Sequence, residues 1–323
     1  MSLETIRLDA YEPRALVWDG DALLNRAGGA IYRLDGSTDH VGRRYSYAFD
    51  AVTTLPGSDL SVVYSRLHTK GLVIRGSEEV REINRSYYQA DAYEYPVALG
   101  RLPTGREVLV HCPEAYNRLE IEDLVTGERL TTGAQRQPCD FFHSRLAVSP
   151  DGQWLLSAGW VWQPFDRIEV FDLVKAMTDP AHLDENGIGI DAWSEHSSAT
   201  FLPDGHLAMW LVGDIDGEDT AVQSGALRIV DPAQPVDATV VSPVDALGTI
   251  LAVDNDHVLA LHGHPRLIEL KSGAVVRSWP EVRSGLQMSS ILPRNEPPPC
   301  FALDAINRRC AIAEDTGITV IRW

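Results

Sequence analysis

Short hydrophobic segments alternate with tight polar turns along the whole chain. The two clearest examples, LAVSPDGQWLLSAG from Leu146 and ATFLPDGHLAMWLVG from Ala199, align without gaps as a strand, a Pro-Asp-Gly turn and a second strand. Hydrophobic residues that alternate with polar ones around such turns are typical of antiparallel β-strands. We therefore expect short β-strands to dominate the structure.

The strand-turn-strand pattern repeats at a nearly constant interval. Weaker copies occur in AVTTLPGSDLSVVYS and VALGRLPTGREVLVHC, and the four turns begin at Pro56, Pro103, Pro150 and Pro203, at spacings of 47, 47 and 53 residues. Degenerate copies near the N-terminus, at Ile250 and at Cys300 bring the number to seven. Most copies are followed by a third strand, and several by a fourth. Four strands in about 45 residues are typical of one β-propeller blade.

The pattern thus predicts an all-β fold: a seven-bladed β-propeller of four-stranded antiparallel blades, formed by residues 1–323 as a single domain. The leading segment TIRLDA has no strand before it, and the final segment GITVIRW ends after only a third strand. We expect the N-terminal strand to complete the last blade, because this closes the ring and removes an exposed sheet edge.

The segment LAVSPDGQWLLSAG, followed by IEVFDL, resembles bacterial propellers loosely grouped with the WD-repeat and YVTN-type proteins. No blade combines Gly-His before its first strand with Trp-Asp at the end of its third. The resemblance therefore implies a propeller fold and little about activity, because one fold supports many functions.

Composition and charge narrow the possible partners. The chain has 44% hydrophobic and 23% charged residues, as expected of a globular protein, and 46 acidic against 28 basic residues give a net charge of −18. This charge repels nucleic acids and anionic membranes, so we predict neither as a partner and favour a basic protein. The charged N-terminal segment predicts no signal peptide or membrane span, and hence a cytoplasmic protein. Four scattered cysteines without a C-x-x-C pair predict reduced thiols.

The blade topology places loops between second and third strands, and crossings between blades, on one face. The loop GWVWQPFD, residues 159–166, belongs there, and aromatic residues concentrate on this face whereas the opposite turns are mainly Asp, Gly and Pro. Tyr and Trp often dominate binding at protein interfaces, although any single ring could instead pack between blades. The candidate binding residues are Tyr88, Tyr93, Tyr95, Phe142, His143, Trp160, Trp162, Trp193, His196, Asp214 and Asp216.

The histidines and the acidic loop permit a second interpretation. His143 and His196 occupy equivalent crossings and could share a metal, or could repeat one structural hydrogen bond. The loop GDIDGED, which contains Asp214 and Asp216, lacks the other ligands of an EF-hand and is interpreted as a solvated acidic loop. No catalytic motif and no cofactor site is evident.

Two function classes remain. The first is a non-enzymatic protein-protein interaction module, such as a scaffold, a sensor or an inhibitor of a basic toxin, that uses the aromatic, acidic face. The alternative is a metal-dependent hydrolase or lactonase at the channel mouth, for which the available ligands are His143, His196 and either Asp50 or Asp140. The first is favoured because no convergent ligand set is visible.

Overall fold

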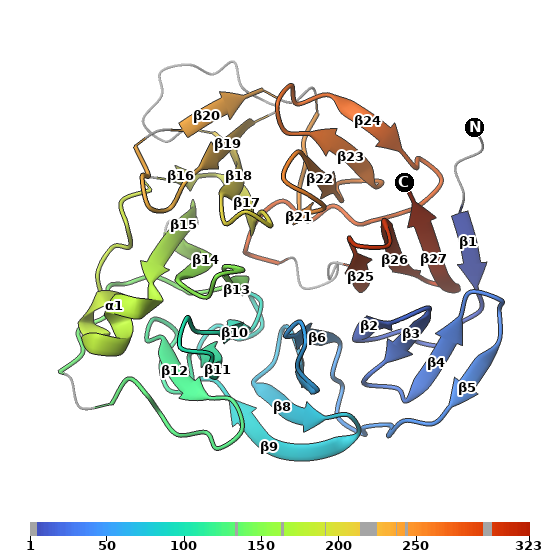
Figure 1. The fold of residues 1–323 in the computed structure, drawn as a ribbon, viewed down its shortest axis with the longest axis horizontal. Helices are drawn as coiled ribbons and strands as arrows, with labels where there is room; N and C mark the ends of the chain where they lie inside the picture. Colours follow the sequence, from blue (N-terminus) through green and yellow to red (C-terminus); the bar gives the residue numbers. More distant parts are fainter. Residues whose placement is uncertain are drawn as a thin grey trace.

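The computed structural model describes residues 5–132, 135–162, 165–190, 192–213, 225–236, 238–242, 245–292 and 299–323. These residues form seven antiparallel sheets arranged as blades around a ring, with the first strand of most sheets near the centre (Figure 1). The predicted seven-bladed β-propeller is confirmed.

The strands of the first four blades follow each other in chain order. Blade 1 contains β2 (Leu16–Asp19), β3 (Ala22–Asn25), β4 (Ala30–Arg33) and β5 (Thr38–His40). Blade 2 contains β6 (Ala51–Thr54), β7 (Leu60–Tyr64), β8 (Lys70–Arg75) and β9 (Glu78–Asn84). Blade 3 contains β10 (Val97–Arg101), β11 (Glu107–His111) and β12 (Glu120–Asp123). Blade 4 contains β13 (Leu146–Val148), β14 (Trp154–Val161), β15 (Phe165–Asp172) and β16 (Trp193–Ser194).

The other three blades complete the ring. Blade 5 contains β17 (His196–Phe201), β18 (Leu207–Val212), β19 (Ala226–Val230) and β20 (Ala238–Val241). Blade 6 contains β21 (Ile250–Ala252), β22 (His257–Ala260), β23 (Arg266–Glu269) and β24 (Val275–Ser278). Blade 7 contains β25 (Phe301–Asp304), β26 (Arg309–Glu314), β27 (Gly317–Arg322) and β1 (Thr5–Leu8).

The N-terminal strand closes the ring as expected. Strand β1 pairs antiparallel with β27, from Thr5 opposite Ile321 to Leu8 opposite Ile318, and the two ends of the chain meet in one blade (Figure 1). The edge of β27 is thereby paired rather than exposed.

Pro-Asp-Gly turns join the first and second strands of blades 4 and 5, as the sequence predicts. In blade 4, Asp151 accepts hydrogen bonds from the Ser149 hydroxyl and the Gln153 amide. Gly152 has a positive φ of 75°, and a Cβ there would lie 1.8 Å from the carbonyl oxygen of Arg101. Only glycine fits this turn against blade 3.

Blade 3 departs from the four-stranded pattern, since its sheet has three strands. A single bridge joins Glu122 to Arg129 where a fourth strand would begin, and the Leu130 amide donates to Ile121 O. The Thr131 side chain then bonds both the Ile121 amide and Glu120. Beyond this bridge, the Thr131 side chain replaces a fourth strand as the hydrogen-bond partner along the outer edge of β12.

The core lies mainly between neighbouring blades. One cluster joins blades 2 and 3 through Tyr64, Val97 and Leu109, and another joins blades 3 and 4. Helix α1 (Leu173–Thr178) and the 3₁₀ helix η1 (Pro180–Leu183) pack against the second cluster from the β15–β16 connection. No helix among the described residues is long and apolar enough to cross a membrane.

Candidate binding surface

The structure gathers six aromatic side chains from blades 2, 3 and 4, here called the aromatic cluster: Tyr88, Tyr93, Tyr116, Phe142, Trp160 and Trp162. Five of them are predicted binding residues. Tyr88 and Tyr93 lie in the crossing from β9 to β10, Tyr116 lies in the β11–β12 loop, and Phe142 precedes β13. The cluster therefore lies on the face that carries the crossings between blades.

The expected loop at residues 159–166 is shorter than the sequence pattern suggested. Strand β14 continues through Trp160 to Val161, and β15 already begins at Phe165. On its other side Trp160 exchanges backbone hydrogen bonds with Phe142, at 2.9 and 3.2 Å. Gly159 permits this approach, because a Cβ there would lie 1.9 Å from Phe142 O. Trp160 is thus a strand residue, paired on both sides.

Phe142 is the centre of the cluster. Its ring lies between Tyr116, with centroids 4.1 Å apart and planes at 22°, and Trp160, at 4.0 Å and 13°. Tyr93 and Trp162 contact it edge to face at 5.5 and 5.4 Å. Each such pair contributes about 0.5–1.5 kcal/mol beyond its buried area, so the rings hold one another in place.

Exposure divides the cluster into a base and a rim. Phe142, Trp160 and Tyr93 form the base and are buried, whereas Tyr88 and Trp162 are 47% and 46% exposed and form the rim with the partly exposed Tyr116. The Tyr116 hydroxyl donates to Asp140 at 2.7 Å, and burial together with this bond raises the pKa of Tyr116. The rim therefore presents ring surface beside a carboxylate.

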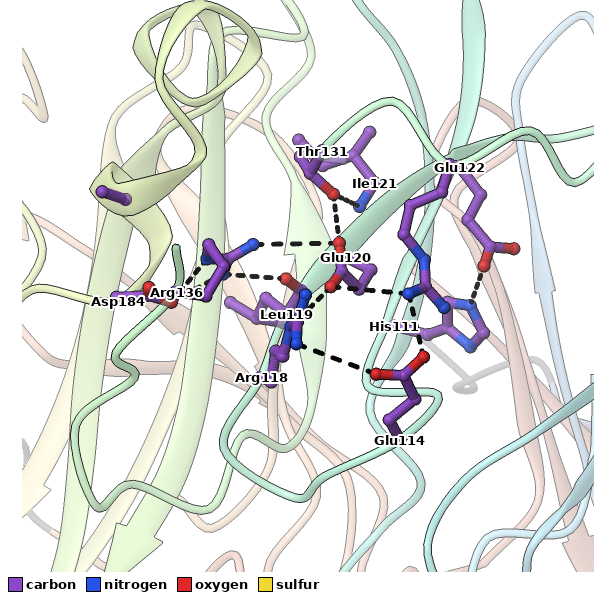
Figure 2. Close-up of polar contacts among 12 residues, drawn as sticks. His111, Glu114, Arg118, Leu119, Glu120, Ile121, Glu122, Thr131, Arg136 and Asp184 are labelled. Atoms are coloured by element: carbon purple, nitrogen blue, oxygen red, sulfur yellow. Dashed lines mark hydrogen bonds and ion pairs between the residues drawn. The ribbon is translucent and has the colours of Figure 1, made fainter. Parts of the chain in front are cut away.

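A network of ion pairs fixes the loop that carries Tyr116 (Figure 2). Arg118 Nε lies 2.7 Å from an oxygen of the fully buried Glu120, and Glu114 lies 2.9 Å from Arg129 Nη1. Arg136 approaches Glu120 from the other side at 3.8 Å and pairs with Asp184 at 2.7 Å. Every one of these carboxylates faces an arginine, so the network holds the β11–β12 loop in place.

A long segment between blades 6 and 7, residues 284–292 and here called the strap, crosses to the cluster. Strand β24 ends at Ser278, and β25 begins only at Phe301. Ile291 forms a bridge with Tyr93, and the Leu292 amide donates to Ala92 O at 2.8 Å. Ile291 packs against the base of the aromatic cluster. The strap thereby joins opposite sides of the ring.

Asp166 anchors the strap. Its fully buried carboxylate accepts hydrogen bonds from the Ser290 hydroxyl at 2.6 Å, the Ser289 hydroxyl at 2.8 Å and the Ser290 amide at 3.1 Å. It also accepts from the Ser197 amide at 2.9 Å, and Arg145 Nη2 lies 3.6 Å away. One carboxylate of blade 4 thus ties together blade 5 and the strap.

Two candidate residues lie inside the protein. Tyr95 is buried between blades 2 and 3 with the Arg85 guanidinium over its ring, and burial raises its pKa. His143 is buried with Nδ1 3.1 Å from the Ser157 hydroxyl, and burial lowers its pKa to about 3. Both side chains are almost fully buried and so offer no free surface.

The remaining candidates lie apart from the cluster or outside the described residues. Trp193 is exposed on the outer strand β16, beneath the guanidinium of Arg167 at 4.6 Å. His196 begins β17, and its Nδ1 is buried without a hydrogen-bond partner. Asp214 and Asp216 lie outside the described residues.

The nominated metal ligands do not converge. Asp140 binds Tyr116, and Asp50 accepts from the Arg66 amide at 2.8 Å, while His143 is enclosed in the core. Within the described ranges, no three His, Cys, Asp or Glu side chains gather as a metal site. The hydrolase alternative gains no support from this arrangement.

Neither a family model nor a curated protein matches the sequence. A chain in the crystal structure of the mitotic checkpoint complex is similar in fold, with a TM-score of 0.60 over 99% of this chain and 91% of that one, at 13% identity. The crystal structure of the computationally designed Ika8 protein gives a TM-score of 0.52 over 100% of both chains, at 14% identity. At these identities the likeness concerns the fold alone.

Proposed function

We propose that this protein is a non-enzymatic protein-binding module, acting in the cytoplasm as a scaffold, a sensor or an inhibitor. The observation that carries the proposal is the rim of the aromatic cluster, where Tyr88 and Trp162 remain about half exposed above a buried aromatic base. Rings held rigidly lose little conformational entropy on binding, and Trp and Tyr are enriched among residues that dominate interface energies.

Charge supports a basic partner. The chain carries a net charge of −18, and Asp140 contacts the rim through the hydroxyl of Tyr116. Complementary charge accelerates encounter, and a Lys or Arg side chain of the partner gains from contact with the ring faces. Chains of this fold occur in protein complexes, as the mitotic checkpoint complex illustrates.

The proposal is tested by comparing variants in a binding assay. The wild-type protein is used to capture partners from the cells that make it, and the dissociation constant of each purified candidate is then measured. Trp162→Ala should raise this constant by about 30-fold, which corresponds to about 2 kcal/mol at an interface hot spot. The affinity should also fall as salt concentration rises.

Ile306→Ala is the matched control. Ile306 is 94% exposed in the β25–β26 turn, on the opposite face of the ring, so its loss should leave the affinity unchanged. If Trp162→Ala and Tyr88→Ala bind as tightly as the wild type, the aromatic rim is not the binding surface.

A further inference from the structure

A partly open cavity of about 270 Å³ lies at the centre of the ring. First strands of blades 1, 2, 4, 5, 6 and 7 line it, and Gln287 of the strap lies at its wall. Four charged residues also line the cavity: Asp50, Arg66, Glu94 and Arg145. This site is separate from the aromatic cluster, so the inference below does not depend on the proposed function.

Both arginines have bonding capacity that the described residues do not use. Arg66 is only 8% exposed, and its Nε has no hydrogen-bond partner, the nearest carboxylate oxygen being that of Asp50 at 3.7 Å. Arg145 uses Nε and Nη1 on the carbonyl oxygens of Ala158 and Ser197. Its Nη2 is buried without a hydrogen bond, and the carboxylate oxygen that pairs with it, that of Asp166, lies 3.6 Å away. Each arginine thus has one buried nitrogen whose carboxylate partner lies beyond hydrogen-bond distance. Buried donors normally make hydrogen bonds, so these two nitrogens at one cavity point to an absent acceptor.

The two carboxylates show the complementary pattern. Glu94 Oε1 accepts from the Tyr64 hydroxyl at 2.9 Å, and Asp50 Oδ1 accepts from the Arg66 amide. Among the described residues, the second oxygen of each carboxylate accepts no hydrogen bond. The lining therefore offers donors and acceptors together, and its four formal charges sum to zero.

We propose that the central cavity binds a small zwitterion of the free amino acid class, with its carboxylate on Arg66 and Arg145 and its ammonium group on Glu94 and Asp50. A simple anion would meet two carboxylates in the same cavity, and a simple cation would meet two guanidinium groups. A ligand with both charges pairs with all four groups. The volume lies just below the usual range for ligand pockets of about 300–1,000 Å³, which favours a ligand of this size.

Thermal melting of the purified protein with each standard free L-amino acid provides the first test. At least one should raise the melting temperature, because a ligand that binds only the folded state stabilises it. Titration calorimetry then compares that amino acid with two analogues, the amine that lacks its carboxylate and the acid that lacks its ammonium group. Both analogues should bind at least about tenfold more weakly. If no amino acid raises the melting temperature or gives heat of binding, or if an analogue binds equally well, the proposal is wrong.

Substitutions locate the site. Arg66→Met keeps the aliphatic stem and removes the guanidinium, and should weaken binding at least about tenfold. Arg75→Met is the matched control, because Arg75 is half-exposed in a surface pair with Asp59 and should not affect binding. Glu94→Gln retains an acceptor for the Tyr64 hydroxyl but removes the charge, and it should also weaken binding. This variant tests the site if Arg66→Met does not fold. Wild-type affinity in either folded variant overturns the proposal.

Discussion

The rings of Trp160 and Trp162 meet edge to face, with centroids 5.2 Å apart and planes at 80°, yet Trp160 is 4% exposed and Trp162 is 46% exposed. Side chains two residues apart on an extended segment point to the same face, so both rings belong to one surface. The backbone of Trp160 pairs with that of Phe142, and the Trp160 ring is buried in the base of the cluster. Trp162 follows the last residue of β14, and its ring lies at the rim.

The two tryptophans should therefore differ in their contribution to stability. Trp160→Ala removes a buried ring stacked on Phe142 and should lower the free energy of unfolding by about 3–5 kcal/mol. Trp162→Ala should lower it by less than about 1 kcal/mol, since its ring is half solvated. Urea denaturation measures both values, and equal losses would contradict the division into base and rim.

Removal of the Asp166 carboxylate should destabilise the strap. Asp166→Ala leaves the Ser290 and Ser197 amides without their acceptor and the buried Arg145 guanidinium without its ion-pair partner, at a cost of about 3–5 kcal/mol. Hydrogen exchange should become faster in residues 284–292 in particular. Asp59→Ala, which breaks only the exposed pair with Arg75, should cost under about 1 kcal/mol. Unchanged exchange in the strap would show that Asp166 does not hold it.

Deletion of residues 1–9 should expose the edge of β27, because strand β1 supplies its pairing partner. We expect a lower melting temperature and concentration-dependent aggregation, measured by light scattering. Deletion of residues 1–4 leaves β1 intact and serves as the control. A full deletion with wild-type melting and no aggregation would argue against closure by β1.

The buried His143 should make the protein sensitive to mild acid. Burial lowers its pKa from 6.5 to about 3 in the folded state, so below about pH 6.5 the unfolded chain binds a proton that the folded protein excludes. Stability is then lost as the pH falls, by at most about 1.4 kcal/mol per pH unit for this group. His143→Gln should flatten the unfolding free energy between about pH 7 and pH 5. His40→Gln, at an exposed position, should keep the wild-type slope.

Local patterns in the sequence were sufficient to predict the ring. Pro150 to Gly152 and Pro203 to Gly205 mark turns through short-range backbone preferences, and the regular spacing of these turns predicts the blades. The sequence also showed that the first strand-like segment, TIRLDA, has no strand before it with which to pair. These features depend on residues close together in the chain, which is why pattern analysis finds them.

The features that pattern analysis missed depend on distant contacts. Asp166 and Ser290 are 124 residues apart, and nothing near either residue indicates that they bond. Tyr116 lies in a loop that was assigned to the correct face, but its stacking on Phe142 follows from how blades 3 and 4 pack. The burial of Tyr95 and His143 was missed for the same reason. Side chains at equivalent crossings are surrounded by different residues of other strands, and the local sequence does not show which.

The strap has a consequence for the order in which the protein matures. A ribosome delivers blades 2, 3 and 4 long before Ser290 and Ile291, yet these two residues complete the anchor at Asp166 and the floor beneath Tyr93. A nascent chain that ends within blade 6 thus contains all six rings of the aromatic cluster but not the strap, which packs against its base. The aromatic cluster with Ile291 packed against it therefore forms only in chains whose synthesis has passed residue 291.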